Sequence, residues 1–173
     1  MQQPRFENLP ETRLIGQQVT MSFAENKTHE LWRQFMPRRH EIKNSVNEFL
    51  YSIEVYPPDF FTHFNPTRPF EKWAAVPVAD HSAIPDAMES ITLPGGLYAI
   101  FIYRGPASKA MKTYMYIYQE WLPKSDYLLD KRPHFALMGE KYKNESPDSE
   151  EEIWIPVKHK EMLSKKAYTQ SPA

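Results

Sequence analysis

Two Glu-x-Tyr pairs are the residues whose types and spacing point most directly to chemistry. They are Glu54 with Tyr56 and Glu140 with Tyr142, and the pairs share one offset, since 140 − 54 and 142 − 56 both give 86. A carboxylate partly withdrawn from water is a strong anchor for a cation, and neighbouring aromatic faces add to the attraction. Withdrawal from water also raises the pKa of a carboxyl group, which makes it a candidate acid or base.

The same offset relates further residues and suggests an internal repeat. Phe49 corresponds to Phe135, and the segment 35–37 (Phe-Met-Pro) corresponds to 121–123 (Trp-Leu-Pro) without a gap. Repeats of this kind indicate a fold built from similar units. We therefore predict two similar halves, each with a helix that ends at a proline and a later strand that carries Phe and the Glu-x-Tyr pair.

Alternation along the two strands assigns their faces. Polar and apolar residues alternate over 49–56, and over 134–142 Met138 shares a face with Glu140 and Tyr142. A period of two places alternate residues on opposite faces of a strand. We expect both Glu-x-Tyr pairs to point away from the helices. Two interpretations stay open: a solvent-facing glutamate on a half-buried sheet, or a groove where the halves meet.

The remaining hydrophobic pattern supplies the elements that must position these residues. Pro37 and Pro123 cannot donate the next helical hydrogen bond and should end the two helices. Each half then reads strand, helix, strand, strand, which predicts an α+β fold with a mostly antiparallel sheet. Further strands are expected over 13–23, 70–78, 97–104 and 152–157, and loops or turns over 4–10, 80–88, 91–96 and 149–152.

Composition excludes several classes of function. The chain has 173 residues, a net charge of −1 and no cysteine, so we expect no direct nucleic-acid partner, no disulfide and no thiolate chemistry. The six histidines show no metal-ligand spacing and no Gly-rich phosphate loop is present, so we expect no metal and no cofactor. No apolar run reaches the roughly 18 residues of a membrane span, and we expect a cytoplasmic protein without membrane contact.

Four segments in order resemble the GyrI-like small-molecule-binding family, the effector-binding domain of some AraC-type and MerR-type multidrug regulators. The segments are 94–101 (PGGLYAIF), 120–127 (EWLPKSDY), 140–142 (EKY) and 152–157 (EIWIPV). Segments 73–76 (WAAV) and 14–16 (LIG) fit as well. The resemblance covers about residues 4–158 as a single domain, with halves at about 4–80 and 91–158 and a polar tail over 159–173.

The resemblance implies two βαββ repeats about a pseudo-two-fold axis, with a ligand groove between them that contains Glu140. Some relatives bind cationic aromatic drugs, others resemble hydrolases of cyclopropane-containing toxins, and one branch inhibits DNA gyrase by protein contact. This chain departs from relatives that carry acidic residues where it has Pro77 and Ala136. That departure should lower the negative charge of the groove and weaken the binding of dications.

Three hypotheses follow. The first is a stand-alone effector-binding module, linked to transcription regulation or to drug or toxin response, that holds an amphipathic aromatic or cationic small molecule. Its candidate ligand-binding residues are Glu140, Tyr142, Tyr98, Trp73, Glu54, Tyr56 and Met138.

The second hypothesis is a hydrolase with Glu140 as general base and Tyr98 as the polarising group. The third is a protein-contact inhibitor of DNA gyrase without a small ligand. Few residues precede the first predicted strand, so we expect no DNA-reading module in this sequence. The expected partner is a small molecule, with a protein partner under the third hypothesis, and the oligomeric state stays open.

Overall fold

A computed structural model describes residues 2–160 as an α+β fold, as the sequence predicts. Its strands are β1 (Arg5–Leu9), β2 (Thr12–Met21), β3 (Leu50–Val55), β4 (Phe70–Pro77), β5 (Glu89–Leu93), β6 (Gly96–Arg104), β7 (Tyr127–Leu129), β8 (His134–Met138) and β9 (Glu150–His159). Its helical segments are α1 (Thr28–Phe35), the 3-10 helices η1 (Met36–Glu41) and η2 (Ala107–Lys109), α2 (Met111–Tyr116), the π-helical η3 (Ile117–Trp121) and α3 (Leu122–Lys124).

The order of the strands shows the repeat. Neighbours run β1-β6-β9-β8-β3-β4-β2-β5, all antiparallel, and β7 pairs with β9 off this path. When β2, β3 and β4 are matched with β6, β8 and β9, the order reads the same from both ends. This confirms two βαββ repeats related by a pseudo-two-fold axis, which passes between β3 and β8.

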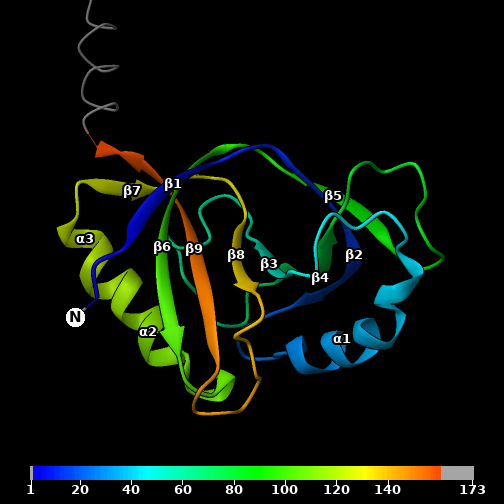
Figure 1. Ribbon diagram of the computed structural model, residues 1–173. Helices are drawn as coiled ribbons and strands as arrows, with labels where there is room; N and C mark the ends of the chain where they lie inside the picture. Colours follow the sequence, from blue (N-terminus) through cyan, green and yellow to red (C-terminus); the bar gives the residue numbers. More distant parts are fainter. Residues whose placement is uncertain (1, 161–173) are drawn as a thin grey trace, which may run out of the picture.

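The helices of the two halves lie on the same side of the sheet. Figure 1 shows α1 and α2 well apart, with strands β8 and β3 between them. Phe35 of α1 packs with Ala74 and Val76 of β4. Trp121, its counterpart at the end of η3, packs against Phe101 of β6. The two helices therefore cover separate parts of one sheet face and leave a strip of sheet between them.

Both helices end near their prolines, as predicted. α1 gives way to η1 at Met36, directly before Pro37. The second helix runs through α2, η3 and α3 and ends at Lys124, one residue beyond Pro123. Proline in the first turn of such a segment is tolerated, because its missing N–H would have no helical partner there.

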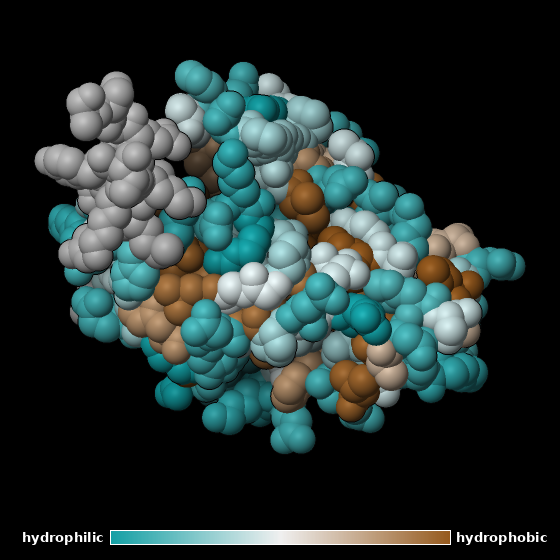
Figure 2. Space-filling model, turned by 90° about the horizontal axis from the view of Figure 1, so that it is seen from above, coloured by the Kyte–Doolittle hydropathy of each residue, from teal (hydrophilic) through white to brown (hydrophobic). Residues whose placement is uncertain are grey.

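The other face of the sheet encloses a core shared by the two halves. Its buried members come from seven strands: Leu14, Tyr51, Ile53, Trp73, Ala75, Leu93, Tyr98, Ile100, Phe135 and Trp154. Seen from above, polar side chains cover most of the surface and apolar ones appear in small groups (Figure 2). Among the described residues, none of the helices is long and apolar enough to cross a membrane.

The predicted faces of the sheet were wrong. Trp32 of α1 donates a hydrogen bond from Nε1 to Ser52 Oγ at 3.4 Å, so the even-numbered residues of β3, including Glu54, face the helices. The odd residues, such as Ile53, lie in the shared core. Alternation separates the two faces of a strand, but with both faces buried it cannot tell which one the helices cover.

Several strand boundaries also differ from the prediction. β1 and β5 were expected as irregular chain and turn, because most of their residues are exposed and give no apolar alternation. β8 ends at Met138, since the chain turns at Gly139, whose carbonyl accepts a hydrogen bond from Tyr142 N at 3.1 Å. β9 begins at Glu150, within the segment predicted as a loop.

Candidate functional site

A buried ion pair lies on the helix-facing side of the sheet. Glu54 and Lys72 are directly opposite each other on β3 and β4, and Lys72 Nζ donates a hydrogen bond to Glu54 Oε1 at 2.6 Å. The side chain of Lys72 is only 7% exposed, and that of Glu54 is 16% exposed. Because burying two charges costs free energy that their attraction often only offsets, such a pair is weak evidence for a purely stabilising role.

Glu151 of β9 adds a second carboxyl group to this cluster. Burial raises the pKa of Glu151 to about 7, with the negative charge of Glu54 also raising it and the ammonium of Lys72 opposing the shift. Within residues 2–160 its carboxyl group makes no side-chain hydrogen bond. Glu151 is therefore the carboxyl group of the cluster that stays available to an incoming molecule.

Tyrosines from the second helix surround the carboxylates. Burial, together with the charge of Glu54, raises the pKa of Tyr114 and of Tyr118 well above the ordinary value, so both phenols stay protonated. The charge of Glu151 acts on Tyr114 as well. Tyr118 lies in the π-helical turn η3, and π-helical turns are frequent at functional sites.

His134 completes the polar cluster from β8. Its Nδ1 lies 2.8 Å from the hydroxyl oxygen of Tyr118, within hydrogen-bonding distance. Burial lowers the pKa of His134 to about 3, with the positive charge of Arg132 contributing. The imidazole is therefore neutral at physiological pH, and the charges of the cluster reside on Glu54, Lys72 and Glu151.

Aromatic rings close over this cluster. Phe61, from the loop 56–69 that joins β3 to β4, stacks on Tyr118 at 5.0 Å and on His134 at 5.6 Å between ring centroids. Tyr56 meets both Phe61 and His134 edge-on, at 4.9 Å in each case. A ligand that reaches the carboxylates must therefore displace rings or insert between them.

The structure separates the residues that the sequence singled out. Glu54, Tyr56 and Met138 belong to the helix-facing side, whereas Trp73 and Tyr98 are buried in the core on the opposite face. The Tyr98 hydroxyl donates to the Pro133 carbonyl at 2.8 Å.

Glu140 and Tyr142 lie beyond the end of β8. Glu140 is exposed in the turn, and Tyr142 is half-buried, with its hydroxyl 3.4 Å from Asn144 Oδ1. Glu140 is thus not brought together with Tyr98 or Trp73, and its role in ligand binding stays a prediction.

Sequence reasoning missed five members of the cluster: Lys72, Tyr114, Tyr118, His134 and Glu151. Glu151 was assigned to a solvated loop. The signal that could have found it is the alternation of Glu151 with Ile153, Ile155 and Val157, which continues the buried face of β9. Nothing in the local sequence of β4 marks Lys72 as paired, because its partner is 18 residues away.

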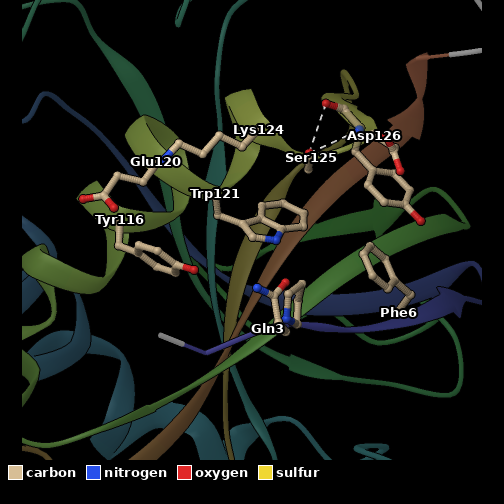
Figure 3. A pocket seen from close by; sticks show the side chains of 10 residues that line it. Gln3, Phe6, Tyr116, Glu120, Trp121, Lys124, Ser125 and Asp126 are labelled. Atoms are coloured by element: carbon tan, nitrogen blue, oxygen red, sulfur yellow. Dashed lines mark hydrogen bonds between the residues drawn. The ribbon is translucent and has the colours of Figure 1, made fainter.

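A separate surface hollow of about 430 Å³ lies on the outer side of the second helix. Figure 3 shows Trp121 at its centre, with Phe6 of β1 and Glu120 of η3 around it. Phe6 stacks on Tyr127 at 4.7 Å, so the hollow combines aromatic faces with a carboxylate. None of the residues predicted from the sequence lines it. Among residues 2–160, no group of three or more His, Asp or Glu could hold a metal ion.

Comparison with known proteins places the chain in a family. The family model of the GyrI-like small molecule binding domain matches residues 2–158. The chain belongs to the GyrI-like family. It is 23% identical over 150 residues to the transcriptional regulator BrlR of Pseudomonas aeruginosa, covering 86% of this chain and 53% of BrlR. The chain thus spans about half the length of that relative.

Solved structures share the GyrI-like fold at low identity. SAV2435, solved with bound tetraphenylphosphonium, superimposes with a TM-score of 0.69 at 18% identity, over 91% of this chain and 94% of SAV2435. A hydrolase encoded by lin2189 from Listeria innocua gives a TM-score of 0.58 at 11% identity, over 90% of this chain and 92% of the hydrolase. The fold thus occurs in a protein solved with bound tetraphenylphosphonium and in a protein described as a hydrolase.

Proposed function

We propose that this GyrI-like domain binds an amphipathic aromatic small molecule carrying positive charge, between α1 and the second helix, with Glu151 as the charged anchor. One observation carries the proposal: among residues 2–160, the partly buried carboxyl group of Glu151 has no side-chain hydrogen bond, and its charge acts on Tyr114 in a cluster closed by aromatic rings. A carboxylate among aromatic faces attracts an organic cation through both charge and ring quadrupoles. As in regulators that contain this domain, ligand occupancy would then report the presence of a drug or toxin.

Isothermal titration with two matched probes tests the anchor. Tetraphenylphosphonium carries one positive charge, and triphenylphosphine oxide offers similar aromatic surface without net charge. We expect Glu151→Gln to weaken tetraphenylphosphonium binding at least tenfold, which corresponds to about 1.4 kcal/mol, because the charge attraction is lost. Binding of the neutral probe should change by less than threefold.

Two glutamate variants serve as matched controls. Glu140→Gln alters the exposed turn after β8, and Glu120→Gln alters the hollow shown in Figure 3. Both should keep wild-type affinity for tetraphenylphosphonium. A selective loss in Glu140→Gln would restore Glu140 as the anchor, and a selective loss in Glu120→Gln would move the ligand to the hollow. No heat with any probe would contradict the proposal and favour a protein partner.

A hydrolase is the second candidate, and the pKa of Glu151 of about 7 favours it. A carboxylate with that pKa can take a proton from water near neutral pH while the water oxygen bonds to an electrophilic carbon. In a cyclopropane-containing substrate, the strained C–C bond to that carbon would break. A phenol such as that of Tyr114 would protonate the carbon that leaves. Consumption of a strained electrophile by wild type but not by Glu151→Gln, with binding retained, would support this candidate.

A further inference from the structure

Lys72 is the feature of the site that the proposed function leaves unexplained. Its residue is 5% exposed, and lysine is almost never so deeply buried unless it is paired. A domain that only had to attract cations would gain nothing from a buried ammonium group on the same strip of sheet as its carboxylates. The pairing with Glu54 across β3 and β4 therefore has another consequence for the ligand.

The charges of the cluster fix how much positive charge a ligand can bring. Glu54 and Lys72 cancel, Glu151 contributes at most one negative charge, and His134 is neutral. The phenols of Tyr56, Tyr114 and Tyr118 remain protonated. One ligand charge can thus be balanced, whereas a second would stay unpaired in a partly dehydrated site, which is strongly unfavourable.

The geometry of the pair also limits what a second ligand charge can gain at Glu54. With Nζ and Oε1 only 2.6 Å apart, no ligand group fits between them, and a further cation at this carboxylate is repelled by the ammonium unless it displaces it. That displacement would leave a buried ammonium without its partner, at a free-energy cost. Lys72 thus holds the position beside Glu54 that a second ligand charge would need.

We propose that Lys72 is a built-in counter-ion that restricts this site to ligands with a single positive charge. Held against Glu54, it neutralises one of the two carboxylates and leaves Glu151 to receive the ligand. This inference rests on the proposed function, because it concerns the charge selectivity of the same site. It makes Lys72 a specificity-determining residue rather than a ligand contact.

Lys72→Met tests the inference, since methionine keeps an unbranched apolar stem and removes the charge. Wild type and variant are titrated with tetraphenylphosphonium and with p-xylylene-bis(triphenylphosphonium), a dication of related aromatic character. In wild type the dication should bind no more tightly than the monocation. In Lys72→Met we expect the ratio of dication to monocation affinity to rise at least tenfold, because Glu54 becomes available. A ratio that stays within twofold of wild type would overturn the inference.

The double variant Lys72→Met/Glu54→Gln is the matched control. It removes the pair together, leaves no unpaired buried charge, and should return the affinity ratio to within threefold of wild type. A ratio that stays tenfold raised would show that the space vacated by Lys72, not the freed carboxylate, admits the dication, and would contradict the inference.

Glu54→Gln carries the test if Lys72→Met does not fold. In this variant Lys72 loses its counter-ion, so the affinity for the monocation should fall at least tenfold, while triphenylphosphine oxide should bind as in wild type. An unchanged affinity for the monocation would refute the inference. Absence of binding by wild type to any probe would overturn the proposed function and this inference together. Binding with an unaltered charge preference would overturn the inference alone.

Discussion

Glu151 lies where opposite charges compete for one carboxyl group. Lys72 on β4 favours its ionised form, whereas burial and Glu54 on β3 favour the protonated form and prevail. The negative charge of Glu151 also helps to raise the pKa of Tyr114 on α2 and of Tyr142 after β8. The same is true of Tyr103, its register partner on β6. Protonation of Glu151 near neutral pH therefore changes both the net charge of the site and the stability of the fold.

The direction of the stability effect follows from the folded and unfolded pKa values of Glu151. The folded pKa of about 7 lies above the ordinary value of 4.5, so the folded protein binds this proton more tightly than the unfolded chain. The stabilisation that the folded protein gains from binding this proton is complete below pH 4.5 and disappears as the pH rises through 7. We expect wild type to lose about 2 kcal/mol relative to Glu151→Gln between pH 5 and 8, allowing for partial exposure.

Urea unfolding across this pH range measures the difference, with m-values compared to check that both proteins unfold similarly. Glu140→Gln, an exposed glutamate on the turn after β8, is the control and should track wild type at each pH. Parallel pH profiles for wild type and Glu151→Gln would show that Glu151 titrates alike in the folded and unfolded states, contrary to the expectation.

Among the elements, the loop 56–69 has the clearest link to the site. It places Phe61 on the rings of Tyr118 and His134, and it anchors itself through Phe60, which is buried with Phe70 and Met21. Arg68 also donates to the carbonyls of Asp59 and Pro58, at 3.1 and 3.0 Å. The loop is thus anchored next to Phe61, and the Phe61 ring forms the part of the cover that a ligand must replace.

Phe61→Ala should open the cover and let water reach His134. Because burial lowers the pKa of His134 to about 3, partial hydration should raise that pKa toward the ordinary value of 6.5. Arg132 opposes protonation, and Glu54, which faces His134 across β3 and β8, remains paired with Lys72. We expect the pKa of His134 to rise by at least one pH unit, as measured by NMR titration of the carbon-bound protons of its imidazole ring.

Phe64→Ala provides a matched control in the same loop. Phe64 is 56% exposed and its ring contacts Phe23 and Phe60 rather than His134, so the His134 titration should not move. Equal shifts in both variants would mean that loosening of the whole loop, not removal of the Phe61 ring, governs access to the site.

Elements with strong local signals could be predicted from the sequence, and the others could not. The prolines at 37 and 123 marked helix ends because they lack an N–H, and both helices end within two residues of them. β1 and β5 were missed, since edge strands that expose most of their side chains carry no apolar alternation. β8 was predicted four residues too long, because the alternation of apolar and polar residues continues through the turn at Gly139.

The site was harder to predict than the fold, for the same physical reason. Glu54 lies on β3 and Tyr56 directly follows that strand, but their partners come from other elements. Lys72 reaches Glu54 through strand register, and Tyr118 reaches His134 only because the helix packs over β6 and β9, next to β8. Register and helix packing are tertiary properties, which a local pattern of residue types does not encode.

At the scale of the whole molecule, the two halves share a core, so we expect them to unfold as one cooperative unit. Phe135 of the second half stacks on Trp154 at 5.0 Å and contacts Tyr51 of the first half at 5.2 Å between ring centroids. The strands β3 and β8 join the halves directly, with Ile53 opposite Phe135. Neither half can bury this cluster alone, since its members are drawn from both.

Phe135→Ala should therefore destabilise the complete domain, by about 3–5 kcal/mol, through the cavity that it leaves. Urea unfolding followed by tryptophan fluorescence and by far-UV circular dichroism should give coincident transitions in both wild type and variant. Phe49 lies directly before β3 and is 39% exposed, so Phe49→Ala should cost less than about 1.5 kcal/mol. Two separated transitions, or equal losses in the two variants, would show that the halves fold independently. The ligand would then lie between two units able to move apart, rather than in the rigid strip of a single sheet.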